Sequence, residues 1–420
     1  MFVKEKVKTE FYDYNPAWEI EAEKTITQLK IIFGENVADI QHIGGTAMKK
    51  IKSKPVIDIA AGLYDINLIV SFADALKKIG FVCDTVNLKN SSEKKTFIKY
   101  GERGKTHIIH VVPYNSNLWF EYIIFRDYIN INDRKAREYE YLKLSVNGKY
   151  KSAMPSYIKA KSDFIKKIIA DNFYSMMLGK NITVKLNQET QEKYPKYSDG
   201  VYPLISGSAE NLKTPGGKNH GAYIIGVYDY DISEKFDGKI IAYIDNGTEK
   251  SFIAAKENTV FYKPEICEAV EFYENSLIDG SADIICLYEK SCGAVIYTKD
   301  GSDIKFLLVK GRASNRIGFP KGHVEKGETE AETAIREIYE ETSLNVVLYS
   351  DFKEEYGYMI SGYIQKKVVY FLAEFKISEK YKIRDGEILE QWLVPYEKAY
   401  QMLTFCQDKT VLKKAYEKIK

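Results

Sequence analysis

The chain has 420 residues, of which 45% are hydrophobic and 29% charged, a composition that is ordinary for a folded globular protein. This length exceeds what one ordinary core holds and predicts two or three domains. The 61 Lys and Arg residues nearly cancel the 59 Asp and Glu residues, which excludes a strong overall field toward DNA or a membrane.

The opening residues, MFVKEKVKTEFYDY, are charged and predict no secretory signal. No run of about 18 apolar residues predicts a membrane span. The five Cys residues are scattered without paired spacing, which argues against a disulfide framework or a zinc knuckle. We therefore expect a cytoplasmic protein with reduced thiols, whose oligomeric state the sequence does not indicate.

The first block, residues 1–173, predicts a mixed α/β or α+β domain. Its first helix is expected at 17–34, where Ile20, Ile26, Leu29 and Ile32 recur at helical spacing before Gly34. The further elements expected are strands at 38–45, 54–63 and 106–114, a helix at 68–80, and charged helices over 119–169.

Several motifs follow one another in this block: His42-Ile-Gly-Gly-Thr-Ala, Lys54-Pro-Val-Ile-Asp-Ile and His107-Ile-Ile-His-Val-Val. Together they resemble the GrpB-like family, of the nucleotidyltransferase fold, over about residues 8–173. The resemblance implies a nucleotide site, for which the candidate residues are Gly44, Gly45, Asp58 and His110. A Gly-Gly turn can admit a triphosphate, and strand carboxylates can hold Mg²⁺ for phosphoryl or nucleotidyl transfer.

Catalysis by this domain needs a second carboxylate, and Ala60 stands where an active transferase usually has Asp or Glu. Nucleotide binding without chemistry, or a purely structural role, therefore remains open beside catalysis. If the domain does make a nucleotide, the other domains could remove that product or its pyrophosphate.

The second block, residues 176–287, predicts a small β-barrel with one helix. Its Tyr202-Pro203, residues 221–227 and residues 236–242 resemble inorganic-pyrophosphatase-like barrels. The DxxDPxD-type strand of a working pyrophosphatase is missing, so we expect binding or scaffolding here rather than hydrolysis. The expected strands are 181–186, 201–205, 221–228, 238–245 and 251–255, and the helix is expected at 264–277.

The third block, residues 291–420, predicts an α/β/α sandwich. Within it, Gly322–Leu344 (here called the box) contains a helix whose Ala331, Ala334, Ile335 and Ile338 are expected to form the buried stripe. The carboxylates of Glu337, Glu340 and Glu341 are then expected on another face, and such a cluster repels itself unless a cation neutralises it. Mg²⁺ or Mn²⁺ prefers this all-oxygen environment.

The box resembles the signature of Nudix hydrolases: Gly, five residues, Glu, seven residues, then Arg-Glu-apolar-any-Glu-Glu-any-Gly-apolar. Gly322, Glu328, Arg336 and the three glutamates fit, and Ser343 alone departs, where the family has the Gly that ends the helix. Ser343 should cost some stability if its φ is positive, but it removes no metal ligand. The resemblance implies that Glu337, Glu340 and Glu341 bind the metal and that Arg336 orients Glu340.

The flanks of the box resemble the diadenosine tetraphosphate hydrolase branch, the asymmetrical bis(5′-nucleosyl)-tetraphosphatases, over about residues 291–420. This resemblance implies phosphate contacts from Lys321, Gly322, His323 and Lys367, an adenine contact from Tyr370, and a base or additional metal ligand from Glu387 or Glu390. We expect Mg²⁺- or Mn²⁺-dependent hydrolysis of a dinucleoside polyphosphate to ATP and AMP. A non-catalytic nucleotide or alarmone sensor and removal of pyrophosphate from RNA 5′ ends remain alternatives.

Overall fold

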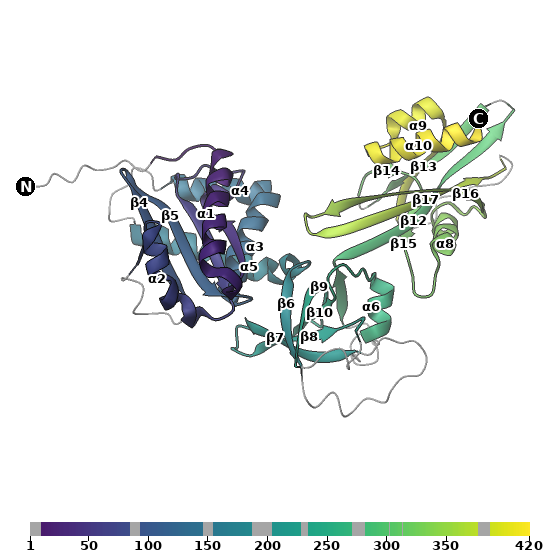
Figure 1. Cartoon of the computed structure of the whole chain (residues 1–420). Helices are drawn as coiled ribbons and strands as arrows, with labels where there is room; N and C mark the ends of the chain where they lie inside the picture. The colour runs from purple at the N-terminus through teal and green to yellow at the C-terminus, as the bar shows by residue number, and fades with distance from the viewer. Residues whose placement is uncertain are drawn as a thin grey trace, which may run out of the picture. The chain divides into compact units, whose positions relative to one another are not determined.

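The computed structural model describes residues 10–84, 93–145, 154–186, 204–227, 234–270, 282–301, 303–312, 314–376 and 387–420 (Figure 1). The chain forms two compact units, one of Met1–Tyr243 with Lys250–Glu257 and the other of Ile244–Glu249 with Asn258–Lys420. Among the described residues, no helix is both long and apolar enough to cross a membrane. The division into three domains at residues 173 and 287 remains a prediction.

The N-terminal part of the first unit is an α/β domain of the nucleotidyltransferase type, built on a five-stranded sheet in the order β1-β2-β5-β4-β3. β2 and β5 are parallel, whereas β1, β3 and β4 pair antiparallel with their neighbours. Its elements are α1 (Ala17–Phe33), β1 (Val37–Ile43), β2 (Ile57–Leu63), α2 (Ile69–Lys78), β3 (Phe81–Cys83), β4 (Lys95–Gly101), β5 (Gly104–Pro113), α3 (Asn117–Ile131), α4 (Asp133–Leu144) and α5 (Met154–Met177).

The first helix forms where its periodicity predicts it, but its buried face differs from the expected one. α1 packs Ala22, Ile26, Leu29 and Phe33 into the core, at spacings of three and four residues. Ile20, expected in the stripe, is 60% exposed. Strands β3 and β4 were not expected, because β3 is only three residues long and Lys95 and Lys99 interrupt the apolar pattern of β4.

The first unit also contains the expected barrel. Five strands are paired in the order β10-β8-β7-β6-β9, and pairing between β9 and β10 closes the ring. The likeness of this barrel to inorganic pyrophosphatases remains a prediction, and Tyr202 and Pro203 lie outside the described residues. The strands are β6 (Asn181–Leu186), β7 (Ile205–Lys213), β8 (Asn219–Ile224), β9 (Lys235–Asp245) and β10 (Lys250–Ala255).

The second unit contains the α/β/α sandwich that the third block predicts (Figure 1). Its sheet has the order β14-β13-β12-β17-β16, and β12 and β17 are its parallel central pair. Helix α8 packs on one face, and α9 and α10 cover the hydrophobic core of the other. The elements are α6 (Lys263–Val270), β11 (Asp283–Cys286), β12 (Tyr288–Asp300), β13 (Asp303–Gly311), β14 (Ile317–Gly318), β15 (Lys321–His323), α8 (Glu330–Thr342), β16 (Val347–Ile360), β17 (Ile364–Glu374), β18 (Ile388–Pro395), α9 (Tyr396–Met402) and α10 (Cys406–Ile419).

Candidate active site

Helix α8 carries Glu337, Glu340 and Glu341, and capping residues within the box define where it begins and ends. Thr329 caps its first turn through a capping box with Glu332, which satisfies backbone N–H groups that have no partner inside the helix. Ser343, which stands at the position of the signature glycine, ends the helix in the left-handed conformation at φ 62°, the condition under which we expect it to cost stability. The helix is thus defined at both ends within the box.

The buried face of α8 is rotated relative to the expected one. Ala334 and Ile338 are buried as expected, but Ile335 is 40% exposed, and Thr333 and Glu337 are buried instead. Apolar character alone does not determine the buried face, because this helix buries the carboxylate-bearing side chain of Glu337. Glu337 therefore faces the interior of the domain, while Glu340 remains about half exposed.

Glu337 packs directly against the backbone of Gly322, the glycine that opens the box. A Cβ atom placed on Gly322 would overlap the Glu337 carboxylate. Gly322 lies in β15, paired antiparallel with Cys292 of β12, so the strand cannot move away easily. The spacing between the signature glycine and glutamate thus reflects direct contact between them.

The side chain of Arg336 forms hydrogen bonds with several separate parts of the box. Its guanidinium donates to both oxygens of Glu328, at 2.6 and 2.9 Å, to Glu337 at 2.8 Å and to Glu340 at 3.1 Å. It also donates to the carbonyl of His323 at 2.8 Å. The orienting role expected of Arg336 toward Glu340 therefore extends to Glu337 and to the loop that carries His323.

The surroundings of two carboxylates of the cluster raise their pKa values. Burial is the main cause that raises the pKa of Glu341 to about 8; the charges of Glu337 and Glu387 contribute in the same direction, and Lys321 opposes them. The pKa of Glu337 is also raised, mainly by burial and also by Glu340 and Glu387. Lys321 donates its backbone N–H to Glu341 at 3.1 Å. Glu387, although exposed, thus acts on both carboxylates, whereas Glu390 forms an ion pair with Lys310.

These carboxylates suit a divalent cation whose coordination shell also includes oxygen atoms of the substrate. Among the described residues, no group of three His, Cys, Asp or Glu side chains is close enough to bind an ion as a complete cage. Mg²⁺ typically takes one or two carboxylates and completes its shell with waters and substrate phosphates. Glu337 and Glu341, whose pKa values are raised mainly by burial and also by neighbouring carboxylates, fit that mode, and Glu340 is close enough to Glu337 to contribute to this effect.

The basic residues differ in where they point. Lys366 donates to Nε2 of His323 at 3.0 Å and lies 3.5 Å from Glu289, and burial lowers its pKa. His323 itself is 3.4 Å from Glu289. Lys367, which the resemblance suggested for phosphate, points to the other face of β17 and pairs with Glu355 at 2.8 Å. Strand alternation thus places Lys366 beside the box, a residue that the sequence reasoning missed.

Tyr370 is fully buried and its ring meets Phe319 edge to face at 5.3 Å. A fully buried ring offers no face to a nucleobase, so this structure gives no support to the expected adenine contact. A more accessible aromatic group lies nearby, where Tyr358 stacks on Phe405 with ring centroids 6.1 Å apart and Arg316 covers the Phe405 ring at 4.9 Å.

The N-terminal candidates also converge. Gly44, at φ 72°, packs against the side chain of Asp58, and a Cβ there would overlap the carboxylate. His110 Nε2 lies 3.6 Å from Asp58. Gly45 faces Ser53 and the ammonium of Lys143, a buried lysine that donates to Ser53 at 2.9 Å. The position at which a metal-dependent transferase usually carries its second carboxylate is occupied by Ala60, which is fully buried. Asp58 therefore lacks that second carboxylate at position 60.

Sequence comparison identifies two families in the chain. The family model described as "GrpB protein" matches residues 8–171, and the one described as "NUDIX domain" matches residues 287–414. A "Glutamate-rich protein GrpB" of Alkalihalophilus pseudofirmus is 36% identical over 154 residues, which cover 36% of this chain and 88% of that protein. The asymmetrical bis(5′-nucleosyl)-tetraphosphatase of Mus musculus is 32% identical over 141 residues, covering 30% of this chain and 93% of that enzyme.

The chain belongs to the GrpB family at its N-terminal end and to the Nudix family at its C-terminal end. Among solved structures, a C. elegans Ap4A hydrolase in a binary complex is 28% identical, with a TM-score of 0.30, and covers 31% of this chain and 97% of its own. The region that matches the Nudix family contains the glycine, arginine and glutamates whose contacts are described above.

Proposed function

We propose that the Nudix part hydrolyses a dinucleoside polyphosphate, with diadenosine tetraphosphate cleaved to ATP and AMP. The observation that carries this proposal is the pair of carboxylates, the buried Glu337 and the half-buried Glu341, beside the cations Lys321 and Lys366. Similarity to the mouse tetraphosphatase over nearly its whole length supports the choice of substrate.

In this proposal Glu337 and Glu341 would hold Mg²⁺ or Mn²⁺ together with waters and substrate phosphates, and the carboxylate of Glu340 would join them when the ion and substrate are bound. The ion would supply charge neutralisation for the phosphates and a more acidic water. Lys321, Lys366 and His323 bind phosphate oxygens, and Arg336 keeps Glu337 and Glu340 in place. A water oxygen forms a bond to the outer phosphorus of one adenosine, the bridging P–O bond breaks, and a carboxylate of the Glu337–Glu341–Glu387 group accepts the proton.

The leaving group is ATP, whose terminal oxygen carries the negative charge that develops as the bond breaks. Cations fixed before the reaction stabilise such charge without reorganising, and Lys321 and Lys366 are fixed by the strands that carry them. Burial lowers the pKa of Lys366, and an incoming phosphate would compensate the cost of keeping its ammonium charged.

The test is turnover of diadenosine tetraphosphate by the full chain with Mg²⁺ or Mn²⁺, resolved by nucleotide chromatography. We expect equal amounts of ATP and AMP, loss of activity on chelation with EDTA, and a loss of at least about 100-fold in kcat for Glu341→Gln. Glu417→Gln, at an exposed glutamate of α10 paired with Lys413, is the matched control and should retain activity. Tight binding without turnover in wild-type protein would instead support a nucleotide sensor.

A further inference from the structure

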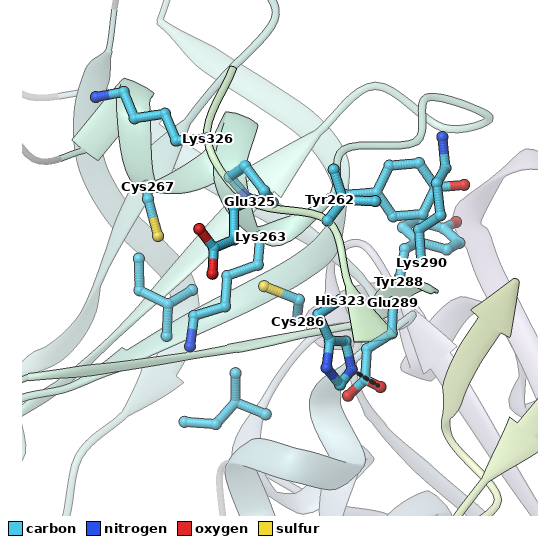
Figure 2. A pocket seen from close by; sticks show the side chains of 14 residues that line it. Tyr262, Lys263, Cys267, Cys286, Tyr288, Glu289, Lys290, His323, Glu325 and Lys326 are labelled. Carbon is cyan, nitrogen blue, oxygen red and sulfur yellow. Dashed lines mark hydrogen bonds and ion pairs between the residues drawn. The ribbon is translucent and has the colours of Figure 1, made fainter. Parts of the chain in front are cut away.

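A cavity of about 640 Å³ adjoins the phosphate-binding loop of the box (Figure 2). Every lining residue belongs to the second unit. One wall comes from the box loop, through His323 and Glu325, and the opposite wall comes from α6 and β11, which precede the region that matches the Nudix family. Figure 2 shows Lys263, Cys267 and Cys286 of that second wall around the same space as His323.

The cavity is directly connected to the groups proposed to bind phosphate. Glu289 and His323 line it, and both contact Lys366, which lies beside the box. A ligand whose phosphate is held by His323 and Lys366 would therefore have one end at the mouth of this cavity. The volume falls within the range that proteins use for small ligands.

A second cavity, of about 470 Å³, is lined by Lys366 together with Tyr356 and Tyr358. The two cavities share Tyr262 and Tyr288 as lining residues and are therefore adjacent. Phosphate-binding side chains thus have a cavity on either side. This arrangement matches a molecule with two nucleosides joined by a phosphate chain better than a mononucleotide, which would fill only one of the two.

The wall contributed by the preceding segment is fixed before any ligand binds. The backbone N–H of Tyr262 donates to Glu265 at 2.7 Å, and the Lys290 ammonium lies over the Tyr262 ring at 4.4 Å. Lys290 also pairs with Glu330 at the start of α8, at 3.0 Å. Ile284 and Cys286 supply buried apolar surface suited to a nucleobase, and Lys263 supplies positive charge suited to its phosphate.

We propose that residues 262–267 and 284–286 complete the substrate site and that the larger cavity binds the second nucleoside of a dinucleoside polyphosphate. This inference rests on the proposed hydrolase function and adds to it a subsite that the Nudix region alone does not contain. The subsite makes the chain selective for substrates with a nucleoside at both ends.

The direct test measures protection of Cys267, which lines the cavity and is in no disulfide. The full chain is alkylated with iodoacetamide in Mg²⁺, with and without a diadenosine tetraphosphate analogue that carries methylene groups at both outer bridging positions. Peptide mass spectrometry follows each thiol. Cys83, in the first unit and similarly half-buried, is the internal control.

We expect the analogue to slow alkylation of Cys267 by at least about fivefold and to leave Cys83 unchanged. Adenosine 5′-tetraphosphate, which lacks the second nucleoside, should protect Cys267 less. An analogue that inhibits turnover but leaves the alkylation of Cys267 unchanged would overturn the inference while preserving the hydrolase proposal. No turnover of diadenosine tetraphosphate by wild-type protein would instead be a failure of the hydrolase proposal.

A kinetic test uses a substitution whose larger side chain fills the cavity. Cys267→Trp should raise KM for diadenosine tetraphosphate about tenfold and change KM for adenosine 5′-tetraphosphate by less than about twofold. Lys413→Trp, on the exposed face of α10, is the matched control. Equal changes of KM for both substrates would contradict a second-nucleoside subsite, and the labelling experiment on unsubstituted protein decides the matter if Cys267→Trp does not fold.

Discussion

Arg336 and Glu328 form a two-point ion pair, with Nε–Oε1 at 2.6 Å and Nη2–Oε2 at 2.9 Å. Both side chains are largely removed from solvent, and Glu328 also accepts from the hydroxyl of Thr333 at 2.8 Å. Since the same guanidinium holds Glu337, this pair sets the position of a proposed metal ligand from a distance. Glu328 therefore acts as a positioning residue rather than a catalytic one.

Arg336→Lys should damage both stability and activity. A lysine keeps the charge but cannot donate two parallel hydrogen bonds to Glu328, so we expect a loss of about 2 kcal/mol in the free energy of unfolding. We expect kcat for diadenosine tetraphosphate to fall at least about tenfold, because Glu337 loses its orientation. Urea unfolding and steady-state kinetics measure the two effects. Arg134→Lys, on an exposed side chain paired with Glu138, should change neither.

The Arg336–Glu328 pair also predicts how stability depends on pH. Hydrogen bonding to Arg336 lowers the pKa of Glu328 from 4.5 in an unfolded chain to about 2. A lowered folded-state pKa contributes stability above the unfolded pKa, and this contribution is lost as the pH falls from about 4.5 toward 2. The difference in unfolding free energy between wild type and Glu328→Gln should therefore shrink by about 2–3 kcal/mol over that interval. A difference that stays constant from pH 6 to pH 2.5 would contradict the assignment.

Adjacent lysines on β17 should behave differently. Lys366→Ala should lower kcat/KM for diadenosine tetraphosphate by about 10- to 100-fold, since Lys366 lies beside His323 and the box. Lys367→Ala removes a partly exposed ion pair with Glu355 and should change kcat/KM by less than about threefold. The two variants serve as controls for each other. A larger effect of Lys367→Ala than of Lys366→Ala would contradict the assignment of Lys366 and support Lys367 as the phosphate contact, as the family resemblance implies.

Ser343→Gly should stabilise the Nudix part. Ser343 ends α8 at φ 62°, a conformation that costs a residue with a Cβ about 1 kcal/mol relative to glycine. We expect an increase of about 0.5–1 kcal/mol in the free energy of unfolding and no change in KM, because the side chain is not among the phosphate or metal candidates. Thermal unfolding of the full chain measures it, and an unchanged or lower midpoint would show that the serine side chain contributes more than its backbone costs.

The sequence was sufficient to predict the box helix, several strands of the sandwich and the cluster of three glutamates, because all of these depend on local sequence patterns. The box helix, its cap and the glutamates are encoded within Gly322–Leu344, and the strands of the sandwich follow alternating or continuous apolar runs. The face that α8 buries was not predictable in this way. Glu337 is buried and Ile335 exposed because carboxylates and Arg336 satisfy one another inside the domain, which hydrophobic periodicity does not record.

Contacts between distant segments explain what the sequence could not indicate. Lys366 meets Glu289 only because β12 and β17 pair with those two residues opposite each other. Tyr370 is buried because Phe319 and the helices beyond it cover that face of the sheet. Alternation along β17 places Lys366 and Tyr370 on the same face, a signal that could have suggested Lys366 once Tyr370 was considered.

The pairing of β12 with β17 has a consequence for folding. Ten residue pairs from Tyr288–Gln365 to Tyr297–Glu374 join the two strands, and both the box and β16 lie between them in the chain. Parallel partners this far apart in the sequence must first close a long loop, which costs chain entropy before any ladder bond forms. On a ribosome, the centre of this sheet therefore remains incomplete until β17 has emerged, so the box is synthesised before the surface on which its helix packs exists in full.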